Sequence, residues 1–228
     1  MRSLATGSSS FATFVQVVPR LPTLLRHLEP TWHLPTLAAL DERFLEAHGI
    51  RGLIWDVDGT LTGDRGRLLP EAAQSFRALL ARAGLKHVVL SNSGEERFRQ
   101  LGDIFPTVPL VRGYLLGKSV LYRRRLGAVD SWSEAELERR LGEGARMIRK
   151  PSAELVDYAI RELECGKDEA VMIGDQYFTD VAGASLAGVR SIKLPTLAKE
   201  TFRFSVRLSH GLEWLTYLAL HGRPRWGP

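Results

Sequence analysis

The feature that most constrains the fold of this chain is an alternation of short apolar runs with helical segments, which begins at Arg51. Short runs rich in Val, Ile and Leu are typical of strands buried on both faces, and intervening helices allow neighbouring strands to run parallel. We therefore expect an α/β fold, a Rossmann-like three-layer sandwich with a central parallel sheet. The expected strands are 52–55, 87–90, 170–173 and 189–194, and the expected helices are 70–83, 95–103, 152–163 and 179–186.

Polar residues gather where the expected strands end. They are Asp56 and Asp58 after the first strand, Ser91 and Asn92 after the second, and Asp175 after the third. Ligands of parallel α/β sheets bind beyond the carboxyl ends of the strands. The alternation and the polar residues together indicate one site at one edge of the sheet.

Asp56 and Asp58 stand one residue apart at the end of an apolar run. Two carboxylates this close cost free energy unless a cation or a shared proton offsets them. Asp56 is a candidate nucleophile, because a carboxylate that attacks phosphorus splits a difficult displacement into two steps. Asp58 is then the candidate general acid and base, which requires the two carboxyl groups to have different environments. The alternative is a solvated turn that contains two acids.

Two further polar elements are candidates for holding a phosphate. Ser91 and Asn92 precede a helix, where backbone N–H groups and a hydroxyl form an anion site; the alternative is a serine that caps the helix. Lys150 is the candidate cation that binds phosphoryl oxygens and lowers the pKa of the nucleophile. The alternatives are that Lys150 is a surface charge or that the neighbouring Arg149 takes this role.

The run that begins at Gly174 supplies the candidate metal ligands. Mg²⁺ prefers oxygen ligands and binds through one or two carboxylates plus substrate phosphate. Asp56 and Asp175 are the expected carboxylate ligands, and the backbone carbonyl of Asp58 is the expected third one. We expect Asp180 to support this group or to begin a helix rather than to bind the metal. The predicted cofactor is Mg²⁺.

The order Asp-Val-Asp-Gly-Thr (56–60), Ser-Asn-Ser (91–93), Lys-Pro (150–151) and Gly-Asp-x-x-x-Thr-Asp (174–180) resembles the four motifs of the haloacid dehalogenase-like (HAD) phosphohydrolases. The resemblance implies a Rossmann-like sheet, Mg²⁺ and a phospho-aspartate intermediate. Position by position, it implies Asp56 as nucleophile, Asp58 as general acid and base, Ser91 as phosphate ligand, Lys150 as charge stabiliser and Asp175 as metal ligand.

The spacing between Asp58 and Ser91 leaves room for a flap (62–69) and one helix, so we expect a small cap or none, as in subfamily IIIA of these hydrolases. The run that begins at Gly174, with Arg149-Lys150-Pro151 before it, is similar to the YqeG-like branch, which includes phosphatidylglycerophosphate phosphatases. The expected parts are an N-terminal extension with a docking helix (1–50, the helix at 37–48), the phosphatase core (51–200) and a C-terminal helical tail (201–228). Segment 112–149 interrupts the alternation, and we interpret it as an insertion, a small lid.

The predicted function is hydrolysis of a phosphomonoester. An open, cap-poor site suits phosphate on a large molecule, and a phospholipid head group such as that of phosphatidylglycerophosphate fits this description. A net charge of +5 favours anionic partners without choosing among them. The alternatives are a nucleic-acid end phosphatase, a small-metabolite phosphatase and a non-catalytic phosphate-binding scaffold; the intact set of candidate residues makes the scaffold the weakest.

Two segments that contain arginines are relevant to whether the protein binds an anionic partner. The expected helix 211–220 carries Leu212 and Leu215 on one face with arginines nearby, which suits peripheral contact with an anionic membrane; the alternative is a terminal helix packed on the core. The run 123–125 is interpreted as a solvated basic face rather than a binding patch.

The expected location is the cytoplasm, with peripheral membrane contact. No run of about 18 apolar residues appears, and the single cysteine, Cys165, fits a reducing compartment. Residues 1–26 contain arginines, serines and threonines but no acid. A targeting peptide there, and with it an organellar location, is the alternative to a frayed terminus.

Overall fold

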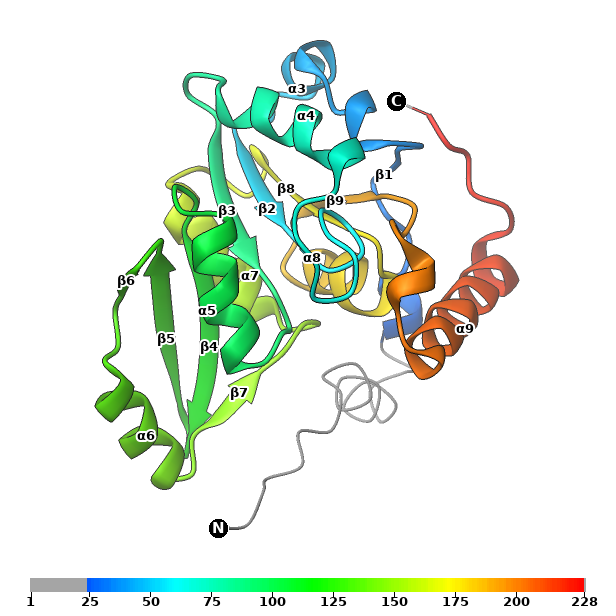
Figure 1. Ribbon diagram of the computed structural model, residues 1–228. Helices are drawn as coiled ribbons and strands as arrows, with labels where there is room; N and C mark the ends of the chain where they lie inside the picture. Colours follow the sequence, from blue (N-terminus) through cyan, green and yellow to red (C-terminus); the bar gives the residue numbers. More distant parts are fainter. Residues whose placement is uncertain (1–23, 228) are drawn as a thin grey trace.

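The computed structural model describes residues 24–227, whose centre is a nine-stranded sheet with helices on both faces (Figure 1). The strand order is β1-β9-β8-β2-β3-β4-β5-β6, and β7 pairs with β4. The expected α/β fold is confirmed, and the adjacent strands β1-β9-β8-β2-β3-β4 all run parallel. The strands are β1 (Trp32–His33), β2 (Gly52–Trp55), β3 (Lys86–Leu90), β4 (Leu110–Leu116), β5 (Ser119–Leu126), β6 (Val129–Asp130), β7 (Arg146–Ile148), β8 (Ala170–Gly174) and β9 (Arg190–Lys193).

The helices follow the expected alternation. They are α3 (Glu42–Ala47), α4 (Pro70–Leu80), α5 (Glu95–Ile104), α6 (Glu134–Gly142), α7 (Ala153–Leu163), α8 (Ala182–Leu186) and α9 (Phe204–His221), with short turns η2 (Leu25–His27), η3 (Leu37–Ala39), η4 (Tyr177–Val181) and η5 (Lys199–Thr201). The helix expected at 37–48 is interrupted, because Asp41 caps α3 by accepting a hydrogen bond from the Phe44 N–H at 2.9 Å.

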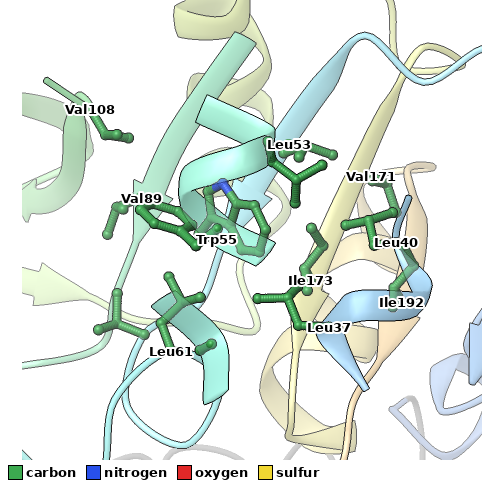
Figure 2. Close-up of a cluster of buried hydrophobic side chains, with 14 of the residues drawn as sticks. Leu37, Leu40, Leu53, Trp55, Leu61, Val89, Val108, Val171, Ile173 and Ile192 are labelled. Atoms are coloured by element: carbon green, nitrogen blue, oxygen red, sulfur yellow. The ribbon is translucent and has the colours of Figure 1, made fainter. Parts of the chain in front are cut away.

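Side-chain alternation along β2 separates two hydrophobic layers. Leu53 and Trp55 pack on one face with side chains from α4 and α5, and Figure 2 shows them beside Val171 and Ile173 of β8. Ile54 points to the other face, where it packs against α7 and α8. Each of these fully buried side chains contributes roughly 1.5–3 kcal/mol by leaving water. The two layers hold the carboxyl ends of β2 and β8 side by side.

The segment predicted to be an insertion, 112–149, continues the sheet. β4 pairs in parallel with β3, whereas β5 and β7 pair antiparallel with β4, so the sheet is mixed at this edge. Within the segment, Ser133 caps the start of α6, since its hydroxyl accepts the Glu136 N–H at 3.1 Å.

The arginine run 123–125 is neither a solvated face nor a binding patch, because its members form ion pairs within the chain. Arg123 is buried and pairs with Glu95 at 2.7 Å and Asp130 at 2.8 Å. Arg112 is also buried and pairs with Glu95 at 2.6 Å. The hydroxyl of Tyr114 donates a third hydrogen bond to the same carboxylate. Arg124 pairs with Glu162, and Arg125 with Asp130.

The arginine-bound Glu95 also supports the candidate phosphate loop. Glu95 is the first residue of α5, directly after the Ser91–Gly94 segment. Arg112 donates to the carbonyl of Ser93 at 2.6 Å in addition to binding Glu95. The loop is therefore fixed to β4 through a buried arginine.

The N-terminal extension is described only from residue 24, so most of the targeting segment considered above (1–26) lies outside the described residues. Its described part adds β1 to the edge of the sheet beside β9. Within residues 24–227, every helix falls short of the length and apolarity that a membrane span requires.

Replacing Glu95 by glutamine should lower the free energy of unfolding by about 3 kcal/mol, because the buried Arg112 loses its counter-ion and the buried Arg123 keeps only Asp130. Burial opposes ionisation of Glu95, but Arg112, Tyr114 and Arg123 outweigh it and hold its pKa below the ordinary value. The carboxylate therefore stabilises the fold at neutral pH, and this contribution is lost as the pH falls through the lowered pKa.

Urea unfolding at several pH values tests this. The free energy of unfolding of Glu95→Gln should be well below that of wild type at pH 7, and the difference should shrink in acid. The matched variant Glu96→Gln, at an exposed position of the same helix, should have the same free energy of unfolding as wild type at pH 7 and in acid. Equal stability of wild type and Glu95→Gln at pH 7 would contradict the role given to this carboxylate.

Candidate active site

The parallel pairing of β2 with β8 brings two acidic loops together. Trp55 is in register with Ile173, and the backbone N–H of Asp56 donates to the carbonyl of Ile173 at 2.9 Å. Asp56 and Asp175 therefore leave the same edge of the sheet as neighbours. This is the arrangement expected from the sequence.

Three buried carboxylates form a cluster at this edge. Asp56, Asp175 and Asp180 each offer an oxygen within 4.8 Å of the others, and they are 8%, 4% and 2% exposed. Asp180 enters this group from η4, which starts two residues after Asp175. Buried like charges repel, so the cluster requires positive charge to be stable.

Lys150 supplies part of that charge. Its ammonium group, 2% exposed, contacts Asp56 Oδ1 at 2.5 Å and Asp180 Oδ1 at 2.7 Å. Arg149, the alternative considered above, turns away and donates to the backbone carbonyl of Asn92. The structure thus brings Lys150, and not Arg149, to the acidic cluster.

The side chain of Asn92 holds the backbone of Lys150 in place. Its Oδ1 accepts the Lys150 N–H at 2.7 Å, and its Nδ2 donates to the Lys150 carbonyl at 3.1 Å. The amide oxygen and one of the two amide N–H groups are therefore occupied within the protein, and the backbone N–H of Asn92 remains the group expected to bind phosphate. Ser91 is half-buried, and its hydroxyl accepts the N–H of Ser93 at 3.2 Å. The residue that precedes α5 as its N-cap is Gly94, not Ser91.

The Asp58 carboxylate stands apart from the acidic cluster. Its Oδ1 accepts hydrogen bonds from Arg97 at 2.8 Å and from Thr62 at 3.0 Å, and its side chain is 23% exposed. Asp56 and Asp58 thus occupy different environments, one buried beside an ammonium and one partly solvated beside a guanidinium. This difference is the one that unequal chemical roles require.

Arg97 was not among the residues identified from the sequence. It lies on the buried side of α5, four residues before Leu101, and also donates to the carbonyl of Gly66 at 2.8 Å. A charged residue at a buried helical position needs a partner, and that spacing is the one sequence signal for Arg97. It joins the Asp58 loop, the flap and α5.

The electrostatics of the cluster leave it short of positive charge. Burial raises the pKa of Asp56 well above its ordinary value, Lys150 opposes the rise, and Asp180 and Asp175 add to it. The pKa of Asp175 is also raised, chiefly by burial. Burial disfavours the ammonium form of Lys150, but Asp180 and Asp56 outweigh it and raise the pKa of Lys150. Lys150 thus contacts two of the three carboxylates. The third, Asp175, has its rise in pKa opposed by the charges of His210 and Lys193, which make no ion pair with it among the described residues.

Asp175 has the features of a metal ligand. Both of its carboxylate oxygens are buried and have no hydrogen-bond partner among the described residues. Such oxygens are costly unless a cation binds them. Gly59 gives them space, since a Cβ at this position would lie 2.5 Å from Asp175 Oδ2, and its φ of +99° also favours glycine. An all-oxygen donor set of this kind suits a hard divalent cation.

Comparison with known proteins is consistent with this geometry. A family model for HAD-like hydrolases matches residues 147–196, a range that includes Lys150, Asp175 and Asp180. The probable phosphatase YqeG of Bacillus subtilis is 25% identical over 186 residues, which are 80% of this chain and 86% of that protein. The phospholysine phosphohistidine inorganic pyrophosphate phosphatase of Bos taurus is 30% identical over 116 residues, and the match spans 48% of this chain and 43% of that protein.

Two solved structures overlap this chain more loosely. An uncharacterized protein from Listeria monocytogenes matches 68% of this chain and 85% of its own at 19% identity and a TM-score of 0.41. A 4-nitrophenylphosphatase from Thermotoga maritima matches 65% of this chain and 87% of its own at 15% identity and a TM-score of 0.31.

Mg²⁺ should raise the thermal unfolding midpoint of the chain, because a cation that binds only the folded state stabilises it. At a concentration of about 100 Kd the gain is about 2.7 kcal/mol, which corresponds to roughly 5 °C or more for a chain of this size. Asp175→Asn should abolish most of this shift without lowering the midpoint of the metal-free protein, since it removes an unpaired buried charge.

Thermal scans in EDTA and in Mg²⁺ measure both effects. Asp103→Asn, at an exposed position of α5, is the control and should respond to Mg²⁺ like wild type. A full shift in Asp175→Asn would exclude this carboxylate as a ligand.

Proposed function

The chain belongs to the HAD-like hydrolases, and we propose that it is a Mg²⁺-dependent phosphatase that cleaves phosphomonoesters through a phospho-aspartate on Asp56. One observation carries this proposal. A buried carboxylate at a strand end contacts a buried ammonium and lies beside two more carboxylates, one of them with unpartnered oxygens. A structural ion pair needs only one acid for one base, so the surplus acids indicate a site for a cation, which can in turn bind a phosphoryl group.

The two aspartates divide the reaction. An oxygen of Asp56 forms a bond to phosphorus, the ester oxygen leaves with the bonding pair, and Asp58 gives that oxygen a proton. Asp58 then takes a proton from a water molecule, which attacks phosphorus, releases inorganic phosphate and restores the Asp56 carboxylate. Arg97 and Thr62 orient Asp58 through one oxygen, so the other is left for proton transfer.

The remaining residues hold charge. Lys150 favours the ionised form of Asp56 despite its burial, and it would bind the phosphoryl oxygens of the substrate. Ser91 and the backbone N–H of Asn92 are the proposed phosphate ligands. Asp56, Asp175 and the carbonyl of Asp58 would hold Mg²⁺, with Asp180 in support. When bound, the ion would neutralise charge on the transferring phosphoryl group.

We propose a phospholipid phosphate as the substrate class, with contact to an anionic membrane surface through α9. The helix docks on the core through Val206, Glu213 and Tyr217. Its other side leaves an exposed apolar stripe at helical spacing, Phe204, Leu208, Leu212 and Leu215, each at least 44% exposed. Exposed arginines lie just before the helix (Arg203), on it (Arg207) and after it (Arg223 and Arg225). An apolar stripe with cationic flanks suits an anionic lipid surface.

Asp56→Asn should abolish release of inorganic phosphate, because an amide cannot form the acyl phosphate, and EDTA should stop the wild-type enzyme. Asp58→Asn should still form phosphoenzyme slowly from a substrate with a good leaving group, since only proton transfer is lost. With p-nitrophenyl phosphate, release of p-nitrophenol reports phosphoenzyme formation and release of inorganic phosphate reports complete turnover, so the two together measure all three. Unchanged turnover in Asp56→Asn would sink the mechanism.

The substrate class is tested by comparing hydrolysis of phosphatidylglycerophosphate with that of a 3′-phosphorylated oligonucleotide and of small phosphorylated metabolites. The proposal expects the lipid to have the highest kcat/KM. A preference for the oligonucleotide or for a metabolite would replace the lipid assignment but keep the reaction. Phosphate binding without metal-dependent turnover of any of them would favour a scaffold.

Membrane contact predicts that the chain sediments with vesicles containing acidic phospholipid and binds purely zwitterionic vesicles more weakly. Leu208→Glu should weaken binding roughly tenfold, because a buried leucine contributes about 1.5–3 kcal/mol. Leu141→Glu, an equally accessible leucine on α6, is the control. Equal binding by the two variants would contradict a role for the stripe on α9.

A further inference from the structure

A second pocket adjoins the acidic cluster. It has a volume of about 370 Å³ and lies between β9, the segment after β9 and α9. Figure 1 shows this segment and α9 together at the end of the sheet that carries β9 and β1. Asp175 belongs to the walls of this pocket as well as to the acidic cluster. The mechanism above uses nothing else in it.

Lys193 is a buried residue of the pocket wall, and it makes no ion pair within 4.0 Å among residues 24–227. It is 6% exposed, and within residues 24–227 its ammonium has one hydrogen-bond acceptor, the carbonyl of Leu194 at 2.7 Å. Its nitrogen also stands 4.9 Å from the ring centre of Tyr177 and 5.9 Å from that of Trp226. An ammonium has three N–H donors, so Lys193 can still donate to a ligand.

A second buried nitrogen atom of this pocket also lacks a hydrogen-bond partner. The Nε2 atom of His210, on α9, is buried and without a hydrogen-bond partner in the described part of the chain. His210 lines the pocket together with Lys199 and Arg207, both exposed. Cationic groups therefore run from the solvent to the buried Lys193.

The carboxylates in the pocket lie near Lys193 but make no direct ion pair with it among the described residues. Asp175 already belongs to the acidic cluster. Glu213 accepts the N–H groups of Tyr177 and Phe178 at 2.9 and 3.4 Å, and its pKa is raised to about 8, first by burial. It is therefore largely protonated near neutral pH. Burial holds the pKa of Lys193 below its ordinary value, although the charges of Asp175, Glu213 and Asp180 oppose this shift.

We propose that this pocket binds a second anionic group, a phosphodiester or a carboxylate, on the leaving group of the substrate, with Lys193 as the residue that determines this specificity. The proposal rests on the function proposed above, because the pocket and the reacting site share Asp175. Phe202 and Trp214 line the pocket with apolar surface that suits the carbon chain between the two anions. The substrate class is therefore a phosphomonoester whose alcohol is itself negatively charged.

Direct binding tests the pocket without catalysis. Calorimetry on the full chain carrying Asp56→Asn, in Mg²⁺, would compare three soluble ligands: glycerol phosphate, with a neutral alcohol; 3-phosphoglycerate, with a carboxylate; and glycerophosphoglycerol phosphate, with a phosphodiester. We expect at least one of the two anionic ligands to bind roughly tenfold or more tightly than glycerol phosphate, as for a charge-assisted hydrogen bond. Tighter binding of 3-phosphoglycerate would show that the pocket recognises a carboxylate, and tighter binding of glycerophosphoglycerol phosphate would show that it recognises a phosphodiester.

Substitution assigns the effect to residues. Lys193→Met should remove most of the preference for the anionic ligand. Arg207→Gln, at the exposed mouth and without consequence for folding, should reduce it severalfold. Lys118→Met, an exposed lysine in the turn between β4 and β5, is the matched control and should retain the preference. Melting curves show whether each variant is folded.

The outcomes are distinguishable from those of the proposed function. Equal affinity of wild type for all three ligands, or equal weakening of all three by Lys193→Met and Arg207→Gln, would overturn the subsite. Absence of hydrolysis by the wild-type enzyme, with the binding preference retained, would contradict the phosphatase mechanism and leave the subsite standing. In active enzyme, Lys193→Met should lower the ratio of kcat/KM for the anionic over the neutral substrate roughly tenfold.

Discussion

The contact of one ammonium group with two buried carboxylates is the interaction on which the rest of this structure depends. Lys150 lies between Asp56 and Asp180 and away from water. Three acids could not be buried together without it, because desolvation and mutual repulsion would protonate or expel them. The ammonium also leaves an imbalance, one positive charge for three acids, and this imbalance lets the site accept a cation. The same contact thus serves stability and chemistry.

Much of the fold outside the cluster keeps this contact in register. Asn92 fixes the backbone of Lys150 with two hydrogen bonds, and Arg112 fixes the loop that carries Asn92. On the other side, Glu213 of α9 accepts the first N–H groups of η4 and so holds the turn that carries Asp180. The C-terminal helix is therefore connected to the reacting groups, although it lies outside the alternating core.

Strand ends could be predicted from the sequence because short β-like apolar runs and polar loops leave a local signal. Asp56 and Asp175 were placed together on that basis, and the register of β2 with β8 agrees. The partners of buried charges leave no such signal. Glu95 and Arg112 are 17 residues apart, and Glu213 and Tyr177 are 36 apart, so only the folded topology brings them together. The three arginines of β5 look like part of an exposed surface in the sequence. In the structure they pair with acidic residues on other elements, Glu95, Asp130 and Glu162.

The antiparallel edge of the sheet escaped prediction for a related reason. β5 carries three consecutive arginines and is half-buried along most of its length, so neither an apolar run nor a strict alternation marks it. Its stability comes from ion pairs with Glu95, Asp130 and Glu162, whose positions depend on the rest of the fold.

The central claim is that the buried, lysine-bound Asp56 is a nucleophile. The most direct measurement is to mix the enzyme with a substrate labelled in its phosphoryl group, stop the reaction in acid within milliseconds, and map the labelled peptide by mass spectrometry. The account predicts phosphate on Asp56, formed before inorganic phosphate is released. An active enzyme that carries no protein-bound phosphate at any time, or carries it on another residue, would contradict the account.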